Sequence, residues 1–142
     1  MLKVGFIGLG TMGFPIAGHI SKSYKTLVFN RTTNKSQKWT SEFEGEICES
    51  VKELTLKSKV IILCLSEDRD IEEVVLGTDG ILEHLNEGTI VVDHSTISAD
   101  TAILISKKLL KKGSIYLDAP VSGGEAGAQN GKLSVMLGGD SA

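Results

Sequence analysis

The chain has 142 residues, of which 41% are hydrophobic and 23% are charged, as in an ordinary globular domain. This composition excludes a disordered tail and a collagen-like repeat, and the longest apolar run, residues 60–65, is far shorter than the ~20 residues that span a bilayer. The net charge is −3, and no basic stripe is interleaved with aromatic residues. We therefore expect neither membrane insertion nor nucleic-acid binding.

Short apolar runs alternate with segments of helical periodicity along the chain. Strands are predicted at residues 4–7, 26–29, 59–65, 89–93, 115–117 and 133–137. Helices are predicted at residues 12–21, around 35–40, and at 51–56, 71–76 and 99–112. Alternation of helices with apolar strands predicts a sheet covered by helices on both faces. We expect residues 1–142 to form one α/β domain of the doubly wound Rossmann type, with a mostly parallel sheet.

The segment 99–112 is the strongest helix prediction. Ser98 is placed to cap its N-terminus and Gly113 to follow its C-terminus. Its apolar residues are predicted to form one face, made of Ala102, Ile103, Ile105, Leu109 and Leu110.

The two cysteines, Cys48 and Cys64, form no CxxC pair and have no nearby histidine. They are expected to be free thiols in a reducing compartment, and no metal site is expected. The first residues run directly into a strand pattern and leave no room for a signal peptide. These features together predict a cytoplasmic protein.

Glycines are concentrated in two stretches, and the first contains a GxGxxG pattern. Gly8-Leu9-Gly10-Thr11-Met12-Gly13 lies between a predicted strand and a predicted helix. Gly8 is expected to make a tight turn, Gly10 to let a pyrophosphate approach the backbone, and Gly13 to let helix and strand pack closely. A glycine turn without a ligand is the alternative interpretation. We predict that all six residues contribute to a dinucleotide-binding loop, with N–H groups of the helix start facing the phosphates.

The residues after the second strand indicate which dinucleotide binds. NAD enzymes carry Asp or Glu about twenty residues after the glycines, but this chain has Asn30-Arg31-Thr32. Asn30 does not repel a 2′-phosphate, Arg31 can hold it with two charge-assisted hydrogen bonds, and Thr32 adds a hydroxyl. The alternative is an ordinary turn with a solvated arginine. The sequence thus predicts NADP(H), with Leu65 and Ser66 bordering the cofactor at the topological switch point.

Three segments carry a family resemblance. Residues 6–13, with Ala17, form the first; Asp93-His94-Ser95-Thr96 is the second; Asp118-Ala119-Pro120-Val121-Ser122-Gly123-Gly124 is the third. Together they resemble the β-hydroxyacid dehydrogenases and, more distantly, 6-phosphogluconate dehydrogenase. The resemblance implies that Thr96 borders the nicotinamide. It also implies that Ser122, Gly123 and Gly124 hold a substrate carboxylate, for which glycine N–H groups and a hydroxyl are suitable donors.

The resemblance also implies hydride transfer between a nicotinamide and a small 3-hydroxy acid or semialdehyde. In that family the general acid is a lysine from an all-helical domain after the nucleotide domain, and no part of this sequence corresponds to it. We expect an NADP(H)-binding fragment of a longer oxidoreductase, inactive by itself, with any oligomer formed by the full-length parent. A non-catalytic sensing or scaffolding module and an imine reductase-type domain are the alternatives. The carboxylate-binding segment favours a hydroxyacid enzyme.

Overall fold

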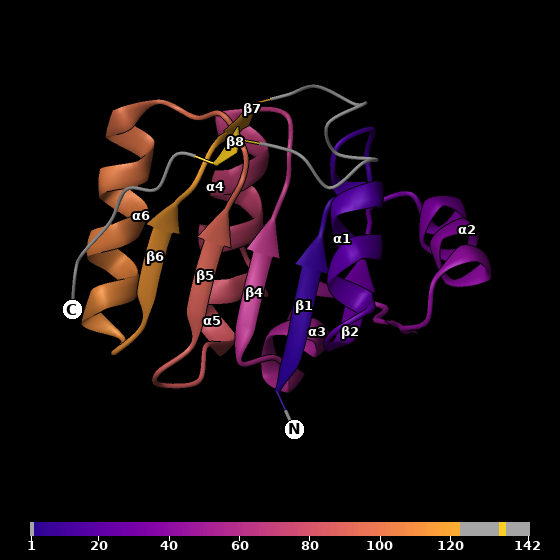
Figure 1. Ribbon diagram of the computed structural model, residues 1–142. Coiled ribbons are helices and arrows are strands. Elements are labelled where there is room, and N and C mark those ends of the chain that lie inside the picture. The colour runs from indigo at the N-terminus through magenta and orange to yellow at the C-terminus, as the bar shows by residue number, and fades with distance from the viewer. Residues whose placement is uncertain (1, 123–133, 136–142) are drawn as a thin grey trace.

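The computed structural model describes residues 2–122 and 134–135, and its main element is a six-stranded sheet (Figure 1). The strands lie in the order β3-β2-β1-β4-β5-β6, and all neighbouring pairs are parallel. Their bounds are β1 (Lys3–Ile7), β2 (Lys25–Phe29), β3 (Glu46–Ile47), β4 (Val60–Leu63), β5 (Ile90–Asp93) and β6 (Ile115–Asp118). The strand order reverses direction between β1 and β4, which confirms the predicted doubly wound Rossmann-type fold.

Helices connect the strands and form two layers. They are α1 (Gly13–Ser21), α2 (Thr33–Glu42), α3 (Val51–Lys57), α4 (Asp68–Leu76), α5 (Ile81–His84) and α6 (Ala99–Lys111). The 13-residue α6 is the longest of these, and none in the described part of the chain is long and apolar enough to cross a membrane.

Two apolar cores lie on opposite faces of the sheet, because successive side chains of a strand point to opposite sides. On one face, Val4 and Phe6 of β1 pack in a cluster with Ala17 of α1 and Trp39 of α2. On the other face, Ile7 belongs to a cluster with buried residues of α3 to α6, namely Leu54, Ile71, Ile81 and Ile105. The helices α1 and α2 thus cover one face and α3 to α6 the other.

The predicted apolar face of the last helix is wrong at two positions. Ile103 and Leu110 are 53% and 55% exposed, whereas the buried row of α6 is Thr101, Ile105 and Leu109. At 3.6 residues per turn, positions four apart share a face, and Ile103 lies about 200° around the helix from Ile105. The row Thr101, Ile105 and Leu109, with the partly buried Ala102 beside it, is therefore enough to dock α6 on the sheet.

Four short elements refine the sequence prediction. β3 and α5 have two and four residues, too short for a periodicity to be recognised. The predicted strand 133–137 is represented by β8 (Ser134–Val135), which pairs antiparallel with β7 (Val121–Ser122) in a separate two-stranded sheet. The glycine-rich segment predicted between the last two strands lies outside the described residues.

Candidate dinucleotide-binding site

The glycine loop lies at the carboxyl end of β1, in the centre of the sheet (Figure 1). The Gly8 N–H donates to the Phe29 carbonyl at the end of β2 over 3.1 Å, and the Cys64 N–H donates to the Ile7 carbonyl over 3.0 Å. The loop is therefore held between the ends of β2 and β4. In doubly wound sheets, this switch point is where ligands bind.

The three glycines of the loop face different surroundings. Gly8 has a φ of +104°, and a Cβ there would lie 2.2 Å from the Cys64 carbonyl oxygen. A Cβ on Gly13 would lie 1.9 Å from the Gly8 carbonyl oxygen, so α1 can start this close to the loop only with glycine. A Cβ on Gly10 would meet nothing within 4 Å. Gly8 and Gly13 are thus required by the turn itself, whereas the space beside Gly10 is open to a ligand.

Asn30 fixes the glycine loop to the segment after β2. Its Oδ1 accepts the Leu9 N–H over 2.8 Å, and its Nδ2 donates to the Thr32 carbonyl over 3.1 Å. Among the described residues, the N–H groups of Gly10, Thr11 and Met12 have no acceptor. Unpaired N–H groups at a helix start are suited to phosphate oxygens. The sequence reasoning assigned Asn30 only a lack of charge and missed this anchoring role.

A cavity of about 260 Å³ opens between the glycine loop, the start of α2 and the loop after β4. Of the predicted contacts, it is lined by Gly8, Gly10, Asn30, Arg31, Thr32, Leu65 and Ser66. The structure thus brings these seven residues together. Thr11, Met12, Gly13 and Thr96 do not line it, and Leu9 is almost completely buried beneath the loop.

The polar groups of this cavity include charges of both signs. The Arg31 side chain is 72% exposed, and its Nη2 lies 3.7 Å from Asp70 Oδ1 and 3.7 Å from Glu73 Oε2 of α4. Lys35 and Asp70 also line the cavity. The sequence reasoning missed both residues, although acidic residues just after the β4 loop and a lysine in the first turn of α2 were visible signals.

A buried hydrogen-bond cluster joins the ends of β4 and β5 to Tyr116 of β6. The Leu65 N–H donates to Ser95 Oγ over 2.7 Å, and the Ser95 N–H donates to Asp93 Oδ1 over 2.9 Å. Asp93 Oδ2 accepts the Tyr116 hydroxyl over 2.6 Å. Burial raises the pKa of the Asp93 carboxyl, and the hydrogen bonds from Tyr116 and Ser95 only partly offset this effect. The cluster holds the Leu65 edge of the cavity.

Comparison with known proteins identifies the family. Residues 3–142 match the family described as the NAD binding domain of 6-phosphogluconate dehydrogenase. The chain belongs to this family. An uncharacterized oxidoreductase of Shewanella frigidimarina is 45% identical over the whole chain, which covers 49% of that protein. The mitochondrial 3-hydroxyisobutyrate dehydrogenase of Mus musculus is 35% identical, and the match covers 96% of this chain and 41% of the length of the mouse protein.

Solved structures give the same result. The structure described as Psf3 in complex with NADP+ and 2-OPP has a TM-score of 0.92 and 33% identity, covering 97% of this chain and 49% of that one. The chain spans about half the length of the curated relatives it matches. The resemblance to β-hydroxyacid dehydrogenases is thereby confirmed, and the chain is an NAD(P)-binding domain of 3-hydroxyisobutyrate dehydrogenase-like oxidoreductases.

Two residues of the second family segment, Asp93 and Ser95, belong to the buried hydrogen-bond cluster described above. His94 of this segment does not line the cavity, and its Nδ1 lies 2.8 Å from the Ala119 carbonyl oxygen. The Ala119 N–H in turn donates to the Asp93 carbonyl over 2.8 Å. Thr96 is exposed after the cluster. His94 therefore ties β5 to the segment that leads into β7, a structural role.

The third segment of the family is described only in part. Ser122 lies in β7, and its backbone pairs with Ser134 of β8. Gly123 and Gly124 lie outside the described residues. The substrate-carboxylate role of these three residues remains a prediction from the resemblance.

One group of possible metal ligands occurs in the described part of the NAD-binding domain, although the sequence predicted none. Asp79, Glu83 and His84 bring one ligand atom each within 4.8 Å of one another. His84 Nε2 lies 2.9 Å from Asp79 Oδ1, and a Glu83 carboxylate oxygen accepts the Asp79 N–H. These atoms already satisfy one another at the surface, so the group is explained as a local turn contact.

Proposed function

We propose that this chain is the NADP(H)-binding half of an oxidoreductase that transfers hydride between the nicotinamide and a small 3-hydroxy acid or semialdehyde. The observation that carries the proposal is a glycine loop with three N–H groups that have no acceptor among the described residues. One of its residues, Gly10, lines a cavity together with Arg31 and Lys35. The dehydrogenase activity named for the mouse relative and the NADP+ named for the Psf3 structure support it.

Each part of the proposed site has a distinct task. The N–H groups of Gly10, Thr11 and Met12 would hold the pyrophosphate, and the Arg31 guanidinium would bind the 2′-phosphate. Bound NADP(H) supplies or accepts the hydride. Leu65, Ser66 and Thr96 would border the cofactor.

The substrate side of the site is proposed from the resemblance. Ser122, Gly123 and Gly124 would hold the substrate carboxylate through a hydroxyl and backbone N–H groups. Proton transfer to the developing alkoxide needs a general acid, and the family resemblance assigns that group to a lysine with no counterpart in this chain. We therefore expect binding of NADP(H) without turnover by these 142 residues.

The free thiols fit a reducing compartment, and a cytoplasmic location is part of the proposal. Burial raises the pKa of both Cys48 and Cys64 to about 11, so both remain protonated and unreactive near neutral pH. Neither thiol is therefore proposed as a nucleophile.

Parallel titrations with NADPH and NADH, followed by nicotinamide fluorescence, test the cofactor assignment. We expect a preference for NADPH of about tenfold or more, which corresponds to about 1.4 kcal/mol. Arg31→Ala should remove this preference. Arg69→Ala is the matched control, since Arg69 is 84% exposed on α4 and does not line the cavity. Equal affinities for both cofactors in the unmodified chain would overturn the NADP(H) assignment.

A further inference from the structure

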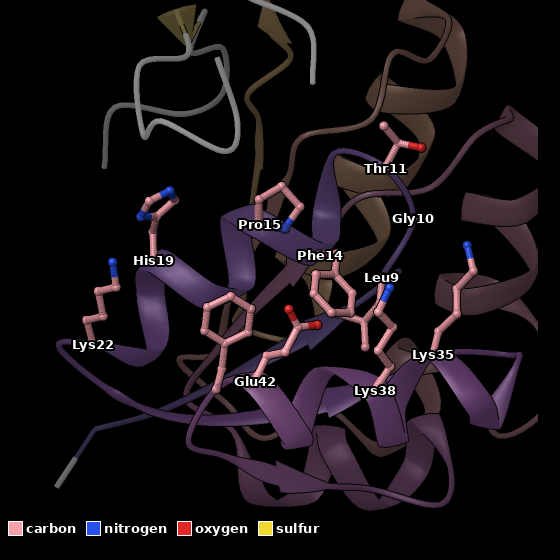
Figure 2. Close-up of a pocket in the computed structure, with 11 residues that line it drawn as sticks. Leu9, Gly10, Thr11, Phe14, Pro15, His19, Lys22, Lys35, Lys38 and Glu42 are labelled. Atoms are coloured by element: carbon pink, nitrogen blue, oxygen red, sulfur yellow. The ribbon is translucent and has the colours of Figure 1, made fainter. Parts of the chain in front are cut away.

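A second hollow, of about 560 Å³, lies between α1 and α2 on the face of the sheet that these helices cover (Figure 2). Its floor is apolar. Phe14 of α1 and Phe43, which follows α2, meet edge to face with ring centroids 5.9 Å apart. Both rings remain partly exposed to the hollow. We call this hollow the α1–α2 groove.

The rim of the α1–α2 groove is cationic. Lys22 follows α1, and Lys35 and Lys38 extend from α2 toward the groove (Figure 2). None of the three lysines is in an ion pair with a described residue. Among the residues that the structure describes, Glu42 is the one carboxylate that lines the groove, so their positive charge is in excess.

Lysines on helix surfaces are usually only solvated, but Lys38 is placed differently. Its Nζ lies 5.8 Å from the centroid of the Phe14 ring, a cation–π distance. The Lys38 side chain is exposed, and its ammonium group lies over the apolar floor. A charged rim beside partly exposed aromatic rings is an arrangement that can bind a molecule with both an anionic and an apolar part.

The α1–α2 groove adjoins the proposed dinucleotide cavity, and Thr11 of the glycine loop lines only the groove. Gly10 and Lys35 line both, because they stand between the two hollows. Arg31, Asp70 and the loop after β4 line only the cavity, whereas Phe14 and Lys38 line only the groove. The two hollows can therefore be tested with separate variants.

We propose that the α1–α2 groove is a second ligand site, for an amphipathic organic anion. The apolar body of the ligand packs on Phe14 and Phe43, and its phosphate or carboxylate head lies between Lys35 and Lys38. A polyanion such as nucleic acid does not fit, because the groove has few cations and includes Glu42. A purely apolar ligand leaves the lysines unused.

Phenyl phosphate is a suitable probe, since it combines one aromatic ring with one phosphate. Isothermal titration calorimetry of the whole chain should show saturable binding. Phenol and inorganic phosphate, each with half of the probe's chemistry, should bind about tenfold more weakly or not measurably. Trp39 packs against Phe43 with ring centroids 5.5 Å apart, so its emission should change on binding of the probe.

Two variants locate the probe. Lys38→Gln should weaken phenyl phosphate binding by about threefold or more, the effect of one partly exposed ionic contact. Lys52→Gln, on the exposed surface of α3, is the matched control and should leave it unchanged. Arg31→Ala should also leave it unchanged. The proposal is wrong if Arg31→Ala weakens the probe and Lys38→Gln does not, if inorganic phosphate binds equally well, or if no saturable binding occurs.

Discussion

The hydroxyl oxygen of Ser95 accepts the N–H of Leu65 over 2.7 Å and so joins the ends of two neighbouring strands, β4 and β5, beside the proposed cofactor cavity. Ser95 is 3% exposed, and its own N–H is held by Asp93. A loop that borders a ligand is usually the least constrained part of a fold. Here the backbone of that loop is fixed by a side chain from the next strand.

Replacing Ser95 with alanine removes the acceptor of the Leu65 N–H. We expect Ser95→Ala to lower the free energy of unfolding by about 1–3 kcal/mol, because a partly buried donor loses its partner. Urea unfolding measures this change. Ser23→Ala, at an exposed serine after α1, is the control and should change the free energy of unfolding by less than about 0.5 kcal/mol. Equal unfolding midpoints for Ser95→Ala and the unmodified chain would contradict the proposed role.

Asp93 should make stability depend on pH. Burial raises the pKa of its carboxyl in the folded chain above the ordinary 3.8, so between these two values the folded state binds more protons than the unfolded state. The free energy of unfolding then falls as pH rises through this window. Asp93→Asn cannot ionise, and its amide can donate to the Tyr116 hydroxyl oxygen, so this variant should lack that loss of stability.

Unfolding curves of both proteins at a series of pH values from about 4 upward provide the measurement. The hydrogen bond from Tyr116 lowers the pKa of Asp93, so Tyr116→Phe should extend the loss of stability to higher pH. If the free energy of unfolding changes with pH in the same way for the unmodified chain and for Asp93→Asn, the carboxyl of Asp93 does not titrate as described.

Most of the fold could be predicted from sequence because its strands are long enough to show a pattern. Each of the strands β1, β2, β4, β5 and β6 contains a run of apolar residues, and segments that include helices separate them. Ser98 caps α6 through the Thr101 N–H, and Gly113 has the expected positive φ of +76°. The two-residue β3 gave no such signal. The exposure of Ile103 and Leu110 on α6 could not be derived either, because the sequence does not indicate how much of the helix surface packs against the sheet.

The site residues could be predicted from sequence at positions where the backbone conformation or the packing admits only one residue type. Gly8 has a positive φ, and Gly13 lies against the loop backbone, as a GxGxxG turn requires. Contacts between distant segments were not predictable. The pairing of Arg31 with Asp70 joins residues 39 positions apart, and the bond from Leu65 to Ser95 joins residues 30 apart. Only the assembled sheet places them together.

Gly10 and Gly13 should respond differently to alanine. Gly10→Ala adds a Cβ in open space, so the variant should unfold at the same urea concentration as the unmodified chain. It should lose about tenfold or more in NADPH affinity, because the methyl group occupies the proposed path of the pyrophosphate. Gly13→Ala should lose stability as well, since its Cβ would lie 1.9 Å from the Gly8 carbonyl oxygen. A Gly10→Ala variant with unchanged NADPH affinity would argue against a pyrophosphate at this loop.

The carboxylate of Asp70 should reduce the ratio of NADPH affinity to NADH affinity. It lines the same cavity as Arg31, its side chain is only 21% exposed, and it competes with a 2′-phosphate for the guanidinium. Asp70→Asn should raise NADPH affinity roughly two- to fivefold and leave NADH affinity unchanged, because only NADPH carries the extra phosphate. Glu73→Gln is the matched comparison. Its carboxylate also lies 3.7 Å from Arg31 but is 67% exposed and does not line the cavity, so its effect should be smaller. If Asp70→Asn instead weakens NADPH binding, then Asp70 holds Arg31 in place for the phosphate rather than competing with it.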